Sequence, residues 1–180
     1  MRESRRSWSW LAVPGIVLAV DGVAYAQVYL TVEQAQQAIF PGETFSEMPL
    51  TLTDQQRAEI KKMCGVNVRH ATLPVWRTSA GGFFIVDDVL GKHEFITYAI
   101  GLHADGTVKQ IEIMEYRETY GDQIRNAPWR QQFVGKTSHA PLKLDQDIKN
   151  ISGATLSCRH VTDGVKRVLT TYELYLQHRP

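Results

Sequence analysis

The chain is predicted to fold as an α+β domain, in which an antiparallel sheet carries a C-terminal helix packed against it and follows a short N-terminal helical lead-in. Three observations predict this class. Residues 83–116 hold three segments rich in β-branched and aromatic residues, which is typical of strands. Apolar residues near the C-terminus recur at spacings of three and four, as on one helical face. Two Thr-x-x-Gln patterns near the N-terminus are typical of capping boxes.

The first 26 residues have the pattern of an export signal. They combine arginines at the start, an apolar stretch from Trp10 to Val20, and the small-x-small sequence Ala24-Tyr25-Ala26. Cleavage after Ala26 would leave a mature protein that is periplasmic or otherwise exported. A retained membrane anchor is the alternative, but the apolar stretch is shorter than the roughly 20 residues that span a bilayer, and Asp21 interrupts it.

Residues 27–82 form the predicted helical lead-in. One helix is expected from Thr31 to about Ile39 and a second from Thr53 to about Met63, because each begins with a Thr that is followed three residues later by Gln. Gly65 is expected to end the second helix, since glycine readily adopts the left-handed conformation of a C-cap.

Residues 83–180 form the second predicted unit. Its strands are expected at Phe83–Val89, Glu94–Leu102 and Thr107–Tyr116, and Ala104-Asp105-Gly106 between the last two is typical of a hairpin turn. The helix that follows should pack on the sheet through one apolar face, formed by Val161, Val165, Val168, Tyr172 and Tyr175.

Composition excludes several classes of function. A length of 180 residues with 43% hydrophobic content suits one domain with a real core, and the formal net charge is only +1. The chain has no basic stripe, glycine-rich phosphate loop or heptad pattern, so no nucleic-acid partner is expected. It has no Cys-x-x-Cys-His haem motif and no zinc-ligand spacing among its histidines. Cys64 and Cys158 could pair in an oxidising compartment, or Cys158 could simply pack the first turn of the last helix.

The run Ser152-Gly153-Ala154-Thr155 stands just ahead of the predicted C-terminal helix. Gly153 and Ala154 remove side-chain bulk, and Gly153 permits a tight loop, so the Thr155 hydroxyl is expected to be exposed. If the helix began near Ser157 or Cys158, its free N–H groups would lie beside Thr155. The alternative is an ordinary loop in which Thr155 or Ser157 caps the helix.

This run resembles the flavinylation motif of the FMN-binding domain family, which includes the C and G subunits of Na⁺-pumping quinone reductases and Rnf-type complexes. In that family the last Thr of the motif carries FMN through a phosphoester bond. The resemblance extends over about residues 83–176, because the family's other segments occur upstream in the same order. These are the strand Gly106–Ile113, the turn Glu118-Thr119-Tyr120-Gly121, the aromatic Trp129, and Phe133-Val134-Gly135-Lys136.

The resemblance implies a cofactor and a set of site residues. FMN would be bound covalently through a phosphoester to Thr155, with Ser152, Gly153 and Ala154 forming the modified loop. The family places further flavin contacts at Glu118, Thr119 and Gly121. Trp129 and Phe133 are assigned to packing, and Arg159 or His160 could pair with the phosphate. One departure concerns Lys149, which stands where the family often has the Asp recognised by the flavin transferase.

The predicted function is that of an exported flavoprotein, which transfers electrons between a membrane reductase and a downstream acceptor. Its partners would be a flavin transferase that uses FAD for maturation and a membrane-bound electron donor. It would serve as a carrier rather than a stand-alone enzyme. The alternative is an exported α+β ligand-binding or regulatory module without a redox cofactor, and a flavin enzyme that reduces a small molecule is a third possibility.

Overall fold

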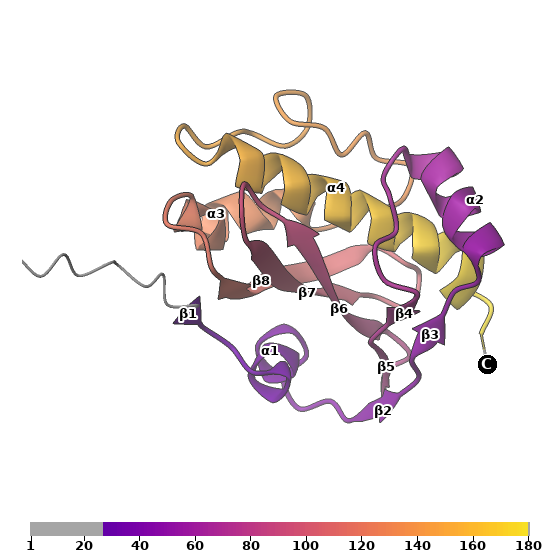
Figure 1. Ribbon diagram of the computed structural model, residues 1–180. Helices are drawn as coiled ribbons and strands as arrows, with labels where there is room; N and C mark the ends of the chain where they lie inside the picture. The colour runs from indigo at the N-terminus through magenta and orange to yellow at the C-terminus, as the bar shows by residue number, and fades with distance from the viewer. Residues whose placement is uncertain (1–26, 180) are drawn as a thin grey trace, which may run out of the picture.

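The computed structural model describes residues 27–179, and the predicted export signal lies outside them. The strands form a six-stranded antiparallel sheet in the order β1-β8-β7-β6-β5-β2 and a separate two-stranded pair, β3-β4 (Figure 1). The strands are β1 (Gln27–Val28), β2 (Phe45–Glu47), β3 (Leu50–Thr51), β4 (Thr72–Leu73), β5 (Val75–Thr78), β6 (Phe83–Leu90), β7 (Phe95–Leu102) and β8 (Val108–Tyr116).

Within these described residues, four helices accompany the sheet: α1 (Val32–Ile39), α2 (Asp54–Cys64), α3 (Ala127–Arg130) and α4 (Thr155–Thr171). Short 3-10 turns flank α3 at Asp122–Arg125 and Gln131–Phe133, and α4 continues as a π-helical turn at Tyr172–Leu176. Helix α4 covers one face of the sheet, with α2 beside its C-terminal half, and α1 covers the other face (Figure 1). The α+β class predicted from the sequence is therefore confirmed.

Each face of the sheet has its own core because side chains alternate along a strand. In β6, Phe83 and Ile85 belong to the large core beneath α4, whereas Phe84 belongs to the smaller core beneath α1. In β7, Tyr98 and Ala99 divide in the same way. Both faces of the central strands are thus buried, which is why these strands read as nearly continuous apolar runs.

The local helix signals are confirmed. The side chains of Thr31 and Thr53 each accept a hydrogen bond from the backbone N–H of the Gln three residues later. The side-chain oxygen of that Gln accepts from the backbone N–H of the Thr, so both capping boxes form. Gly65 closes α2 in the left-handed conformation, with φ of 79°. Gly106 has φ of 84° in the turn between β7 and β8, and Asp105 accepts hydrogen bonds from Thr107 there.

The segment 27–82 contributes more than the expected helical lead-in. Strands β1, β2 and β5 join the same sheet, and β5 pairs with β6 from Val75 opposite Ile85. The expected boundary between residues 82 and 83 therefore falls inside one continuous sheet. These strands have two to four residues each, which is too short for a visible alternation of apolar and polar positions. Their pairing with longer strands determines their conformation.

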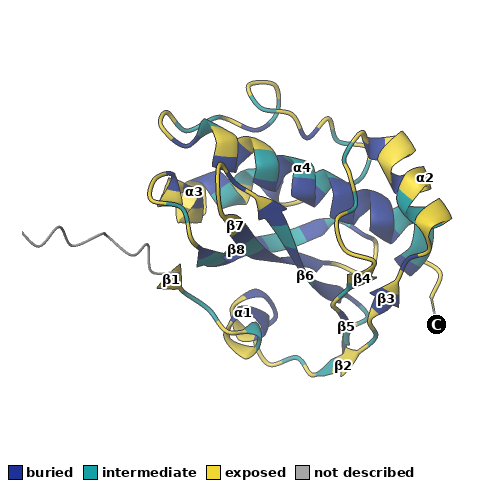
Figure 2. Ribbon diagram, viewed as in Figure 1, coloured by how far each residue is buried: buried dark blue, intermediate teal, exposed yellow. Residues whose placement is uncertain are grey.

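Helix α4 packs closely on the sheet at Gly164. A Cβ atom at this position would lie 2.6 Å from the hydroxyl oxygen of Tyr98 and 2.7 Å from a methyl carbon of Val89. Its sheet-facing side is continuously buried (Figure 2), and Val161, Val165 and Val168 on it are at most 1% exposed. Among residues 27–179, no helix has both the length and the apolar character needed to cross a bilayer.

Candidate functional site

Thr155 is the first residue of α4 and is half-buried. The turn before it contains exposed Ser152 and Gly153, and Gly153 has φ of 84°, a left-handed conformation that favours glycine. The amide nitrogen of Asn150 donates a hydrogen bond of 3.0 Å to the Thr155 hydroxyl oxygen. The other polar atom of that amide, Oδ1, is buried without a hydrogen-bond partner in the described structure. Asn150 thus holds the Thr155 side chain in one orientation at the N-terminus of α4.

The N-terminus of α4 has no side-chain cap. Its N-cap residue is Ala154, so no side-chain oxygen accepts from the first turn, and the first helical hydrogen bond runs from the N–H of Cys158 to the carbonyl of Ala154. The helix begins at Thr155, two or three residues earlier than expected. Neither Thr155 nor Ser157 acts as the cap, so the ordinary-loop alternative is wrong on this point. The free N–H groups and the positive end of a 17-residue helix lie at the candidate acceptor itself.

The Ser157 side chain contacts the turn that follows β8 through Tyr116. Its hydroxyl lies 2.9 Å from the hydroxyl of Tyr116, which in turn donates to the backbone carbonyl of Tyr120. Gly121 lies against this cluster with φ of 100°, and a Cβ atom there would be 2.9 Å from the Ser157 oxygen and 3.5 Å from Cα of Ala154. The Glu-Thr-x-Gly turn and the Ser-Gly-Ala-Thr loop, more than thirty residues apart in sequence, are therefore in direct contact.

Glu118 and Thr119 have different surroundings. One carboxylate oxygen of Glu118 accepts hydrogen bonds from the backbone N–H groups of His93 and Glu94, at 2.6 and 3.0 Å. Burial by itself would raise the pKa of Glu118, but these backbone donors outweigh it and lower the pKa. Glu118 thus fixes the turn between β6 and β7. Thr119 is exposed, and flavin contact by either residue stays a prediction.

The loop ahead of Thr155 is held by Asp147. Its carboxylate accepts from the ammonium group of Lys136 at 2.9 Å and from the backbone N–H groups of Leu142 and Lys143 at 3.2 and 2.8 Å. Burial would raise the pKa of Asp147, but these donors lower it overall. The Asp147 carboxylate is therefore bound within the loop itself.

The hydrogen bonds that Lys149 makes all come from its backbone. Its carbonyl accepts from the Trp129 indole at 2.9 Å and its N–H donates to Gln132 at 2.7 Å, while the residue itself is exposed. Trp129 and Phe133 are buried and make an edge-to-face contact with ring centroids 5.1 Å apart, which confirms their assignment to packing.

A recess lies beside Thr155, between α4 and the loop that precedes it. It is lined by Thr155, Arg159 and Asp163 of α4 together with Lys143 and Asp145 of the loop. Burial raises the pKa of Asp163. His160 lines a separate recess with Asn67 and Leu90. Arg159 and His160 were the two residues considered as partners for a phosphate at Thr155. Of these, Arg159 lines the recess beside Thr155.

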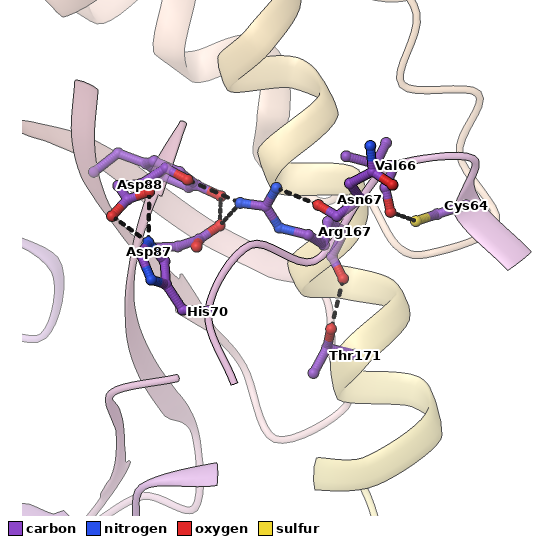
Figure 3. Close-up of polar contacts among 9 residues, drawn as sticks. Cys64, Val66, Asn67, His70, Asp87, Asp88, Arg167 and Thr171 are labelled. Atoms are coloured by element: carbon purple, nitrogen blue, oxygen red, sulfur yellow. Dashed lines mark hydrogen bonds and ion pairs between the residues drawn. The ribbon is translucent and has the colours of Figure 1, made fainter. Parts of the chain in front are cut away.

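A buried ion pair fastens α4 to the sheet (Figure 3). The Arg167 guanidinium lies 2.5 Å from a carboxylate oxygen of Asp87 in β6 and also donates to the backbone carbonyls of Asp88 and Asn67. The hydroxyl of Tyr98 donates to the same oxygen of Asp87 at 2.7 Å. Burial would lower the pKa of Arg167, but Asp87 raises it overall, so the guanidinium stays charged.

The two cysteines lie in the core beneath α4. Cys64 and Cys158 are both free and buried, and burial raises the pKa of Cys158. Cys158 thus packs the first turn of α4. In the part of the chain from Gln27 to Arg179, no group of three or more His, Cys, Asp or Glu side chains could hold a metal ion.

Sequence reasoning did not find Asn150, Tyr116 or Ser157 as parts of a site. Asn150 occurs in the sequence as one polar residue among several in a loop, and nothing local distinguishes it. Tyr116 and Ser157 are 41 residues apart, so only the fold brings them together.

The fold and this site define an α+β domain that presents a threonine at an uncapped helix N-terminus. Residues 91–170 match the family model of the FMN-binding domain. This segment, which includes the Glu-Thr-x-Gly turn, the Ser-Gly-Ala-Thr loop and most of α4, belongs to the FMN-binding domain family. The protein is therefore a flavin-binding protein whose cofactor is FMN. A comparison of the chain with curated proteins gave no match.

Proposed function

We propose that this protein is an exported electron carrier with FMN bound covalently to Thr155. The observation that carries the proposal is the position of Thr155, whose hydroxyl is oriented by Asn150 at the uncapped start of α4. A phosphodiester on this oxygen would lie next to free N–H groups and the positive end of the helix dipole, where an anion is stabilised. Arg159 in the same recess adds a positive charge.

The attachment needs a flavin transferase with FAD as the donor. The Thr155 oxygen forms a bond to the phosphorus of the FMN half of FAD, the phosphoanhydride bond breaks, AMP leaves, and the transferase takes the hydroxyl proton. Threonine at its ordinary pKa is a poor nucleophile, so the base must come from the transferase. The exposed Ser152-Gly153 turn leaves that enzyme room to close around the acceptor.

When bound, FMN supplies reversible electron transfer. The protein holds the ring, shields it from water and sets its potential through hydrogen bonds and local dielectric. A covalent bond suits an exported protein, because a flavin that dissociated outside the cytoplasm would be lost. We further propose a membrane-bound reductase as electron donor. An exported binding module without a redox cofactor is the competing function, and Lys149 is the residue that favours it.

Intact mass of the mature protein, co-produced with a flavin transferase, tests the proposal. Wild type should gain the mass of one FMN less one water, and Thr155→Val should gain none. Thr44→Val is the matched control, since it makes the same change at an exposed threonine outside the motif, and it should be loaded like wild type. A flavin mass on Thr155→Val, or an unmodified wild type beside an active transferase, would reject Thr155 as the acceptor.

A further inference from the structure

Tyr120 is the most exposed of the large hydrophobic side chains in the described residues. Its exposed fraction is 83%, compared with 63% for Val28, the next highest. Phe95, the other aromatic residue in this group, has the Arg69 guanidinium 4.9 Å from its ring centroid. Within residues 27–179, the Tyr120 ring has no such aromatic or cationic partner. Both faces of the ring are thus available to a planar ligand.

The backbone beneath this exposed ring is held firmly. The Tyr120 carbonyl accepts the hydroxyl of Tyr116, a residue that is only 2% exposed. On its other side, Gly121 leaves no room for a Cβ atom, which would lie 2.5 Å from the Tyr116 hydroxyl oxygen and 2.9 Å from that of Ser157. The ring is therefore presented from a fixed turn rather than from a loose loop. Such an arrangement reduces the ordering cost of binding a flat ligand.

The same contacts place Tyr120 beside the proposed cofactor. Tyr116 joins the Tyr120 carbonyl to Ser157, which lies two residues after Thr155 in the first turn of α4. A flavin at Thr155 would reach across this short separation through its ribityl chain. Leu156, 41% exposed and next to Thr155, adds apolar surface on the helix side. Stacked aromatic rings are a preferred contact for exposed planar surfaces.

We propose that Tyr120 stacks on one face of the isoalloxazine ring of FMN attached at Thr155. This inference rests on the proposed function. Tyr120 would act as a positioning residue that shields this face from water and restricts the ring to one orientation. The competing role for such an exposed tyrosine is to contact a protein partner, in which case it would leave the flavin untouched in the isolated protein.

Fluorescence of the loaded protein tests the stacking. A tyrosine in contact with an excited flavin gives it one electron and recovers that electron, so emission is quenched without net oxidation. Wild type should therefore be weakly fluorescent, and Tyr120→Ser should be several-fold brighter per bound flavin. Tyr120→Phe should also be brighter, because a phenyl ring is hard to oxidise. Tyr120→Phe should keep the visible circular dichroism of a flavin held in one orientation, whereas Tyr120→Ser should lose most of this signal.

Tyr175→Ser, in the π-helical turn after α4, is the control and should match wild type in both measurements. Intact mass of every sample separates the two proposals. A wild type without flavin on Thr155 would overturn both of them. A loaded wild type and a loaded Tyr120→Ser with equal emission and equal circular dichroism would overturn the stacking alone and leave the carrier function standing.

Discussion

Arg167 in α4 and Asp87 in β6 form an ion pair of 2.5 Å in which both side chains are more than nine-tenths buried. The pair joins residues 80 positions apart and fastens the helix that carries Thr155 to the central sheet. Because the same guanidinium also donates to the carbonyls of Asn67 and Asp88, it connects the 66–74 segment to this helix as well (Figure 3).

Removing one partner of this pair should be costly. Arg167→Met leaves a buried carboxylate without its counter-charge, so we expect a loss of about 3–5 kcal/mol in the free energy of unfolding. The double variant Arg167→Met/Asp87→Asn removes both charges and should lose clearly less than the sum of the single variants. Chemical denaturation checks this, with the half-buried neighbour Lys166→Met as control. Additive losses would show that the two side chains are not coupled.

Gly164 should not tolerate alanine. Gly→Ala inside a helix ordinarily stabilises by about 1 kcal/mol. Here the new methyl group would meet Tyr98 and Val89 at 2.6 and 2.7 Å, so we expect a net loss of about 1–3 kcal/mol. Adding Tyr98→Phe removes the nearer atom and should restore part of the loss, relative to Tyr98→Phe alone. Thermal unfolding would contradict the close approach if Gly164→Ala raised the melting temperature.

Asn150 should affect modification of Thr155. Asn150→Ala removes the hydrogen bond to the hydroxyl, and one such bond is worth about 0.5–1.5 kcal/mol. We expect the initial rate of FMN incorporation to fall about 2–10-fold, as measured by a mass time course with purified transferase and FAD. Gln146→Ala, an exposed loop residue nearby, should incorporate at the wild-type rate. Equal rates for Asn150→Ala and wild type would mean that the transferase orients the hydroxyl unaided.

Lys149 should limit modification if the transferase requires a carboxylate there. The Lys149 backbone makes its hydrogen bonds whatever the side chain, so Lys149→Asp should leave the loop intact. We expect faster FMN incorporation in this variant. Lys62→Asp, which makes the same charge change at an exposed residue of α2, is the control and should have no such gain. A slower rate in Lys149→Asp would indicate a transferase suited to the lysine.

Asp147 should make the loop acid-sensitive. Its pKa is lowered in the folded protein, so the unfolded chain binds more protons near pH 4, and stability rises with pH in that range. The contribution is complete above about pH 5 and is lost as the pH falls through the folded pKa, below about 4. Asp147→Asn should therefore cost about 1–3 kcal/mol at pH 7 and almost nothing at about pH 2. Urea unfolding at both values measures this, with exposed Asp145→Asn as control.

The predictable parts of the structure are those that depend on near neighbours. The capping boxes at Thr31 and Thr53, the left-handed Gly65 and the turn at Gly106 each follow from chemistry within a few residues. The long central strands were also predictable, because they are rich in β-branched and aromatic residues. The start of α4 was placed too late, since Ala154 is a poor cap by intrinsic preference and only its tertiary contacts accommodate it there.

The sequence by itself determined the α+β class, the central strands, the C-terminal helix and the family motif that contains Thr155. Those features depend on periodicity and on short runs of residue types. Only the tertiary structure decided that Gly121 packs on Ala154, that Tyr116 joins Tyr120 to Ser157, and that Arg167 pairs with Asp87. These contacts form between distant segments when the sheet and α4 bury their apolar faces, and no local pattern encodes such a meeting.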